Sequence, residues 1–231
     1  MNKRILFLFP LFLLLAWGTA FSLEITEKEL EAFLRGEYNR SSTYCGDMSA
    51  AGGIELNNQY KIKSGVSVGK SAGLVDINAF TGAKYTPLSN VPHLAVSLAY
   101  IYNGLPVYET HTHSILPVIS YNAERAGISI GPNFRFVSFF GEKPIFETIL
   151  SFDIYFNFVN DETLAIGLSV GNFSEFYPKN MGAYSLSLNA IIRLDSNWSL
   201  INQLELMQSG GDGFSTTFYG FGWRGGAKYS W

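Results

Sequence analysis

The chain has 231 residues, of which 47% are hydrophobic, 16% are aromatic and only 15% are charged, with a formal net charge of −3. Soluble domains carry nearer 25% charged residues, so the composition favours a protein with a large apolar surface. The mild acidity and the lack of a basic tract argue against a nucleic-acid partner, and the single cysteine, Cys45, excludes an internal disulfide.

The first 22 residues have the organisation of a secretory signal peptide. A basic start at Lys3–Arg4 precedes the apolar run Ile5–Trp17, and small residues allow cleavage after Ala20 or Ser22. The apolar run is shorter than the roughly 20 residues that span a bilayer, which argues against a membrane anchor. We therefore expect residues 1–22 to be removed on export.

Residues 23–52 are expected to form a short helix and a linker. Thr26 and Glu29 have the spacing of a capping box, and Leu30, Phe33 and Leu34 then form one short apolar face, which predicts a helix over 26–35. The remainder is rich in Gly, Ser and Asn and is interpreted as a linker, with its place relative to the rest of the fold left open.

From residue 53 to residue 231 the apolar residues alternate with polar or small ones, which is typical of strands with one apolar face. The pattern predicts an all-β, closed antiparallel transmembrane β-barrel of about ten strands, with eight or twelve as alternatives because 53–90 is irregular. The expected strands are 53–68, 73–85, 93–102, 113–121, 127–138, 148–158, 163–172, 183–194, 198–207 and 215–231.

The connections between these strands alternate in length. The expected turns are 122–126, 159–162 and 195–197, and the longer loops are 103–112, 139–147, 173–182 and 208–214. Outer-membrane barrels have short turns in the periplasm and longer loops outside. A soluble barrel of the lipocalin kind has the same period with its apolar face inside. The small residues on the less apolar face and the aromatic residues near strand ends favour the membrane barrel.

The last strand carries the resemblance to a known class. Its apolar face ends in Tyr229 and Trp231, and glycine or polar residues occupy the other face. This pattern resembles the C-terminal signal strand of bacterial outer-membrane β-barrel proteins, with Trp where Phe is usual. The general character is similar to the small OmpW and OmpX barrels. The resemblance implies assembly by the barrel assembly machinery and residence in the lipid of the bacterial outer membrane.

Charged residues on the less apolar face are the expected lining of the lumen. They are Arg135, Asp153, Arg193, Glu205, Arg224 and Lys228. Eight strands enclose an interior that side chains fill, whereas 16 to 18 leave an open channel, so about ten strands predict at most a narrow pore.

One group of residues has the composition of a metal or catalytic site. Glu109, His111 and His113 alternate and so share a strand face, and His and carboxylate are ordinary zinc ligands. No Ser-His-acid order or His-x-Ser motif of the barrel enzymes accompanies them. A polar rim segment is therefore the favoured interpretation, and the sequence favours a protein without enzymatic activity or cofactor.

Three functions are consistent with these features. The leading hypothesis is a narrow channel for small polar solutes. The alternative is a structural or surface-interaction barrel without transport, and the third is a rim enzyme that uses Glu109, His111 and His113. The sequence does not indicate an oligomeric state.

Overall fold

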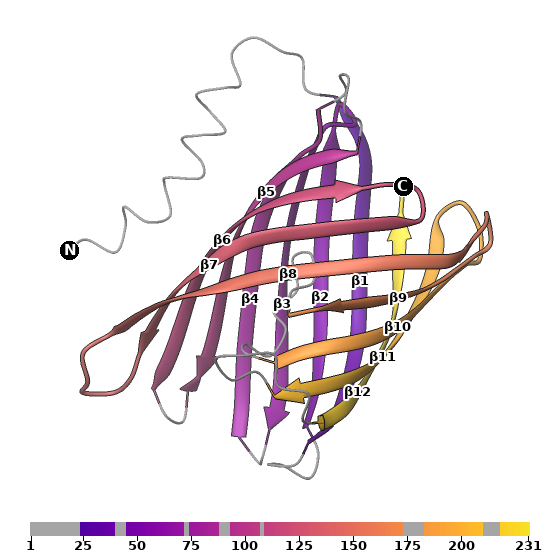
Figure 1. Ribbon diagram of the computed structural model, residues 1–231. Helices are drawn as coiled ribbons and strands as arrows, with labels where there is room; N and C mark the ends of the chain where they lie inside the picture. The colour runs from indigo at the N-terminus through magenta and orange to yellow at the C-terminus, as the bar shows by residue number, and fades with distance from the viewer. Residues whose placement is uncertain are drawn as a thin grey trace.

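In the computed structural model, the described part of the chain forms a closed barrel of twelve antiparallel strands (Figure 1). The described residues are 24–39, 45–71, 74–87, 93–106, 109–172, 183–209 and 218–231. The strands are β1 (Ile25–Asn39), β2 (Cys45–Leu56), β3 (Tyr60–Ser71), β4 (Leu74–Tyr85), β5 (Leu94–Leu105), β6 (Thr110–Asn122), β7 (Ala126–Ser138), β8 (Ile145–Asn160), β9 (Leu164–Gly171), β10 (Ala183–Arg193), β11 (Trp198–Ser209) and β12 (Phe218–Ser230).

Each strand pairs with its neighbours in the chain, and β1 pairs with β12 to close the sheet. Closure satisfies every strand edge, which a sheet in hydrocarbon requires because no water is available to hydrogen-bond exposed peptide groups. The last residue takes part, since the N–H of Trp231 donates to the carbonyl of Lys28 at 3.0 Å and the reverse bond measures 2.9 Å.

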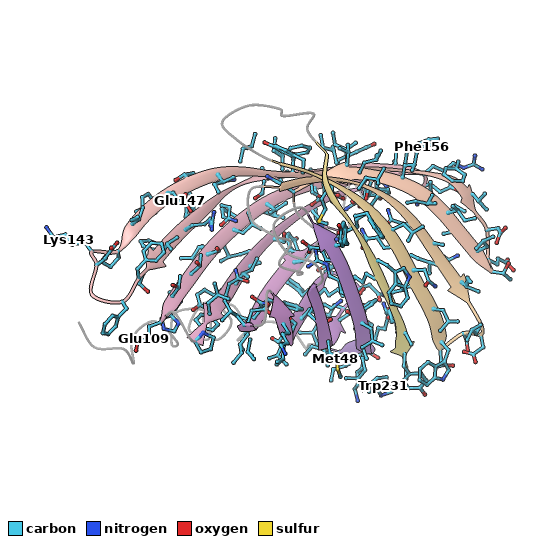
Figure 2. The ribbon with its side chains drawn as sticks, turned by 90° about the horizontal axis from the view of Figure 1, so that it is seen from below. Met48, Glu109, Lys143, Glu147, Phe156 and Trp231 are labelled. Atoms are coloured by element: carbon cyan, nitrogen blue, oxygen red, sulfur yellow. The ribbon has the colours of Figure 1, made fainter. Side chains whose placement is uncertain are left out.

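The alternation of side chains gives the barrel two different surfaces. On β8, Ile154, Phe156 and Phe158 are 43%, 54% and 48% exposed, whereas Ser151 is buried. Large apolar residues are exposed in the same way around the ring, and Phe156 and Met48 project away from the barrel in Figure 2. Such an apolar outer band is stable only in contact with lipid hydrocarbon.

Two turns at the barrel end where β1 begins and β12 ends, here called the terminal end, are fixed by aspartates. Oδ1 of Asp161 accepts hydrogen bonds from the backbone N–H of Leu164 at 2.7 Å and of Thr163 at 2.9 Å. Asp195 binds two backbone N–H groups of the β10–β11 turn in the same manner. These backbone hydrogen bonds hold the pKa of Asp161 below its ordinary value, because they stabilise the charged carboxylate.

The helix expected over residues 26–35 is wrong, since β1 occupies this segment. The capping-box residues have other partners: the hydroxyl of Thr26 donates to the carbonyl of Glu55 at 3.3 Å, and Glu29 binds lysines of other strands. A helix here would leave the edges of β2 and β12 unpaired, a cost that exceeds local helix propensity.

The expected linker is also wrong in part, because β2 occupies 45–56. The barrel consequently has twelve strands, the upper alternative, and the count of ten missed β1 and β2. Each of the ten expected strands overlaps at least one observed strand. The expected signal peptide 1–22, the loop 173–182 and most of 208–214 lie outside the described residues. Within the described part of the chain, no helix is long and apolar enough to cross a membrane.

Candidate functional site

The inner surface of the barrel is built from the residues that alternate with the lipid-facing ones. Leu188 is 41% exposed on the outer surface, as is Ile154 at 43%, while their neighbours Asn189 and Asp153 belong to the opposite face. Residues that are paired on adjacent strands share a face, so each strand adds one stripe of side chains to the interior. Two parts of this interior differ strongly in composition.

Charged side chains concentrate on the inner faces of β11, β12, β1, β2 and β3, a region here called the charged wall. These strands are contiguous because β12 pairs with β1. The charged wall includes Glu27, Glu29, Glu31, Arg35, Glu37, Asp47, Lys61, Lys63, Glu205, Arg224 and Lys228.

Glu29 is the centre of the first network of the charged wall. Its carboxylate lies 2.6 Å from Nζ of Lys228, 2.8 Å from Nζ of Lys61 and 3.4 Å from Nζ of Lys63. The residue is only 3% exposed. Lys63 also contacts Glu31 at 2.6 Å. Lysines of β3 and β12 thus bind one carboxylate of β1, and these ion pairs link the three strands.

Arg35 is the centre of the second network. Its guanidinium lies 2.9 Å from Glu37, 3.6 Å from Asp47 and 3.8 Å from Glu205. These four side chains are at most 14% exposed. A buried guanidinium shared by three carboxylates ties β11, β1 and β2 together, and its loss would leave acids without their cation.

Arg224 is held by an aromatic ring on the same wall. Its guanidinium carbon lies 3.7 Å from the ring centroid of Phe33, a cation–π geometry. The ring in turn covers Gly226 of β12, where any Cβ would overlap the ring and the backbone of β1. Glycine is required at this position by the close approach of the two strands.

The inner faces of β5 and β6, here called the neutral wall, carry no charged residue along the described length of the two strands. Leu116 and Ser114 are 1% and 0% exposed, and Leu116 packs in a cluster with Phe80, Ile101 and Val118. The buried residues of this wall are Ala95, Ala99, Ile101, Thr112, Ser114, Leu116, Val118 and Ser120.

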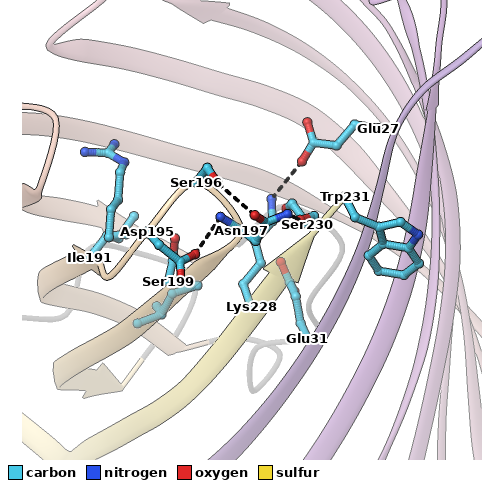
Figure 3. Close-up of a pocket in the computed structure, with 12 residues that line it drawn as sticks. Glu27, Glu31, Ile191, Asp195, Ser196, Asn197, Ser199, Lys228, Ser230 and Trp231 are labelled. Atoms are coloured by element: carbon cyan, nitrogen blue, oxygen red, sulfur yellow. Dashed lines mark hydrogen bonds and ion pairs between the residues drawn. The ribbon is translucent and has the colours of Figure 1, made fainter.

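The terminal end contains a cavity of about 600 Å³ (Figure 3). It lies between the charged wall and the β10–β11 turn, and Lys228 reaches Glu27 at its edge with a separation of 3.8 Å. Its lining is Glu27, Glu31, Ile191, Arg193, Asp195, Ser196, Asn197, Ser199, Ile201, Lys228, Ser230 and Trp231. The arrangement offers ionic and hydroxyl contacts of the kind that small polar solutes require.

The six residues that the sequence assigned to the lumen occupy different surroundings. Glu205, Arg224 and Lys228 belong to the charged wall. Arg193 and Lys228 line the cavity. Arg135 pairs with Glu147 at 2.9 Å on the β7–β8 hairpin, away from the charged wall.

Asp153 lies opposite Ser129 in the β7–β8 register. The sequence reasoning missed the charged residues of β1 to β3, among them Glu29, Arg35 and Lys61. The signal was present in the alternation of Glu27, Glu29, Glu31, Arg35 and Glu37, but the capping-box spacing was given more weight.

Glu109, His111 and His113 do not form a ligand set. His111 and His113 lie on the outer face of β6, because the residues between them are the buried ones, and Glu109 occupies the preceding turn with a φ of 47°. Nδ1 of His113 is 2.7 Å from the hydroxyl of Tyr100, and Nδ1 of His111 is 2.8 Å from that of Tyr102. Among the described residues, no group of three His, Cys, Asp or Glu side chains is arranged to hold a metal ion.

The two residues expected to signal assembly lie at the terminal end. Tyr229 packs against Trp198 with ring centroids 4.8 Å apart and against Trp231 at 5.3 Å. Aromatic clusters of this kind mark the edge of the lipid-facing band in outer-membrane barrels. Trp231 is 49% exposed and projects outward in Figure 2.

Solved structures with the same fold are outer-membrane barrels. The NanC porin superposes with a TM-score of 0.56 at 8% identity and covers 86% of this chain and 98% of that chain. An outer membrane channel from Pseudomonas putida F1 gives 0.54 at 11% identity, covering 93% and 98%. The translocator domain of the autotransporter NalP from Neisseria meningitidis gives 0.53 at 9% identity, covering 98% and 95%. No protein-family model and no curated protein matches the chain.

These likenesses establish the fold and identify no subfamily. Together with the closed sheet and the exposed apolar band, they define an outer-membrane β-barrel protein, and its location is the bacterial outer membrane.

Proposed function

We propose that the protein is a narrow channel for small polar solutes. The observation that carries the proposal is the cavity of about 600 Å³ at the terminal end, lined by charged and hydroxyl side chains. Twelve strands lie between the eight that side chains fill and the 16 to 18 that leave an open channel, which supports a constricted path. Porins among the structures of similar fold are consistent with this role.

The test is conductance in planar bilayers, with two variants that differ only in the face they alter. The folded protein should give discrete current steps. Ser199→Trp places a large ring in the cavity and should reduce each step by more than half. Leu200→Trp places the same ring on the outer surface, where Leu200 is 36% exposed, and should leave the steps unchanged. Folded protein that never conducts would contradict the proposal.

A structural barrel without transport is the second candidate, and the neutral wall favours it. Ser114 and Leu116 are almost completely buried, so the interior is filled beside this wall. A filled barrel would serve as a scaffold for surface loops. Loop deletions that remove surface binding from a folded, non-conducting protein would support this candidate over the channel.

For biogenesis we infer export by the signal peptide 1–22 and recognition of the last strand by the barrel assembly machinery. The pairing of Trp231 with Lys28 supports a role of the terminal residue in closure. Deletion of Trp231 should lower the amount of heat-modifiable protein in the outer membrane, and replacement by Phe should restore it.

A further inference from the structure

The network around Glu29 has the geometry of an occupied anion site. Three ammonium groups from two strands converge on one carboxylate, at 2.6, 2.8 and 3.4 Å. Lys63 is shared with Glu31 at 2.6 Å and Lys228 with Glu27 at 3.8 Å, and Glu29 is the one carboxylate that all three lysines approach. The lysines Lys61, Lys63 and Lys228 therefore surround Glu29 as they would surround a bound carboxylate.

One carboxylate oxygen of Glu29 is held less closely than the other. Its Oε1 is buried and accepts no hydrogen bond among the described residues, although Nζ of Lys63 lies 3.4 Å away. The side chain crosses Gly53 of β2, where a Cβ would lie only 2.8 Å from Oε1. A glycine thus provides the room for the carboxylate, and one of the two oxygens has unused capacity to accept a hydrogen bond.

The site is connected to the cavity at the terminal end. Lys228 lines that cavity and holds Glu29 at 2.6 Å, and Glu31, which binds Lys63, also lines it. The side chains of Lys228 and Lys61 are 25% and 28% exposed, whereas that of Glu29 is 3% exposed. A solute in the cavity therefore meets Lys228, one of the three ammonium groups that bind Glu29, and Glu31, which binds a second one, Lys63.

We propose that Lys61, Lys63 and Lys228 form a carboxylate-binding site of the barrel interior, at which Glu29 is the resident ligand that a solute carboxylate replaces. The site selects small organic anions, and Glu29 together with Glu27 and Glu31 balances the three lysine charges when no solute is present. The binding site stands on the ion-pair geometry alone, while the passage of carboxylates through it rests on the channel function proposed above.

The test is chemical rescue of Glu29→Ala by acetate. The variant removes the carboxylate that all three lysines share and leaves a space of that size beside them, with Glu31 still on Lys63 and Glu27 still on Lys228. Its thermal unfolding midpoint, followed by heat-modifiable gel mobility in detergent, should rise saturably by several degrees when acetate replaces chloride at constant ionic strength and pH 7. The unaltered protein should show no such rise.

Glu205→Ala is the matched control. It removes a carboxylate of similar burial, but the Arg35 beside it keeps Glu37 and Asp47 as partners, so the charge of this cation stays balanced. Acetate should not rescue this variant. Equal responses of the two alanine variants, or no response of Glu29→Ala beyond that to chloride, would overturn the proposal.

Glu29→Gln preserves the shape of the side chain and covers the case in which the alanine variant does not fold. Binding of carbon-13-labelled acetate should then broaden its NMR line, and adding Lys228→Met should abolish the broadening. Absence of broadening with the folded glutamine variant would also overturn the proposal. These readouts need no current, so acetate binding without conductance would contradict only the channel function, and conductance without acetate binding would contradict only this site.

Discussion

The charged wall and the neutral wall lie in one barrel and have the same alternation of side chains, yet they bury different kinds of group. The charged wall buries ion pairs around Glu29 and Arg35, and the neutral wall buries hydroxyl and aliphatic groups around Leu116. The charged wall includes the closure between β1 and β12, where the register must be unique, and pairwise charges provide such register specificity. The neutral wall has local hairpin partners and requires only packing.

The largest effect should follow from breaking the charged wall at Arg35. Arg35→Met leaves Glu37, Asp47 and Glu205 without their shared cation and should cost about 3–5 kcal/mol of unfolding free energy. Arg135→Met breaks a pair whose partner Glu147 is 42% exposed, and should cost about 1 kcal/mol or less. Urea unfolding in vesicles, followed by tryptophan fluorescence, measures both, and equal costs would contradict the special status of the charged wall.

The next prediction compares a charge introduced on the outer surface with the same charge introduced in the interior, away from the charged wall. Leu188→Arg places a charge in the lipid and should cost about 2–4 kcal/mol, whereas Asn189→Arg faces inward and should cost less. Cysteines at 188 and 189 in a Cys45→Ser background give a second measurement. A lipid-phase spin quencher should reach position 188 and not 189, and the reverse result would invert the assignment of the two faces.

A smaller effect is expected where the side chain of Glu29 crosses β2. Gly53→Ala brings a Cβ within 2.8 Å of Oε1 of Glu29 and should cost about 1–3 kcal/mol. Gly52→Ala, one residue earlier on the outer face, meets Leu30 at 3.4 Å and the backbone oxygen of Glu29 at 3.7 Å and should be close to neutral. Urea midpoints of the two variants make the comparison, and similar values would show that Glu29 moves aside without cost.

On the neutral wall, removal of a hydroxyl that makes no hydrogen bond should raise the stability, whereas removal of one that makes a hydrogen bond should lower it. The hydroxyl of Ser114 is buried without a hydrogen-bond partner among the described residues, so Ser114→Ala should raise the stability by about 1 kcal/mol. The hydroxyl of Ser120 is 2.8 Å from that of Ser129, so Ser120→Ala should lower the stability by about 1 kcal/mol. Destabilisation by Ser114→Ala would indicate a polar partner that the geometry does not show.

The smallest effect lies outside both walls, in the β8–β9 turn. The pKa of Asp161 is lowered by backbone hydrogen bonds, so its contribution to stability is complete above the ordinary value of 3.8 and is lost as the pH falls through the lowered pKa. Asp161→Asn should therefore flatten the acid limb of the stability profile slightly. An unaltered acid limb in Asp161→Asn would contradict the assignment.

The sequence alone determined the class of fold and most of the strands. From β5 to β12 the alternation of lipid-facing and inner residues is largely regular, because each of these strands separates hydrocarbon from a polar interior. The outward positions of Ile154 and Leu188 follow from that period. Within the charged wall, Glu205, Arg224 and Lys228 were named from alternation in β11 and β12 in the same way.

Only the tertiary structure decided that residues 25–56 form strands. Thr26 and Glu29 favour a helix locally, and the glycines of β2 favour a linker, but both segments pair as strands because the barrel must close. The partners of Glu29 come from β3 and β12, roughly 30 and 200 residues away in the chain, so no local spacing reveals them. A closed sheet brings its first and last strands together, so the ion pairs between them form only when all the strands are in place.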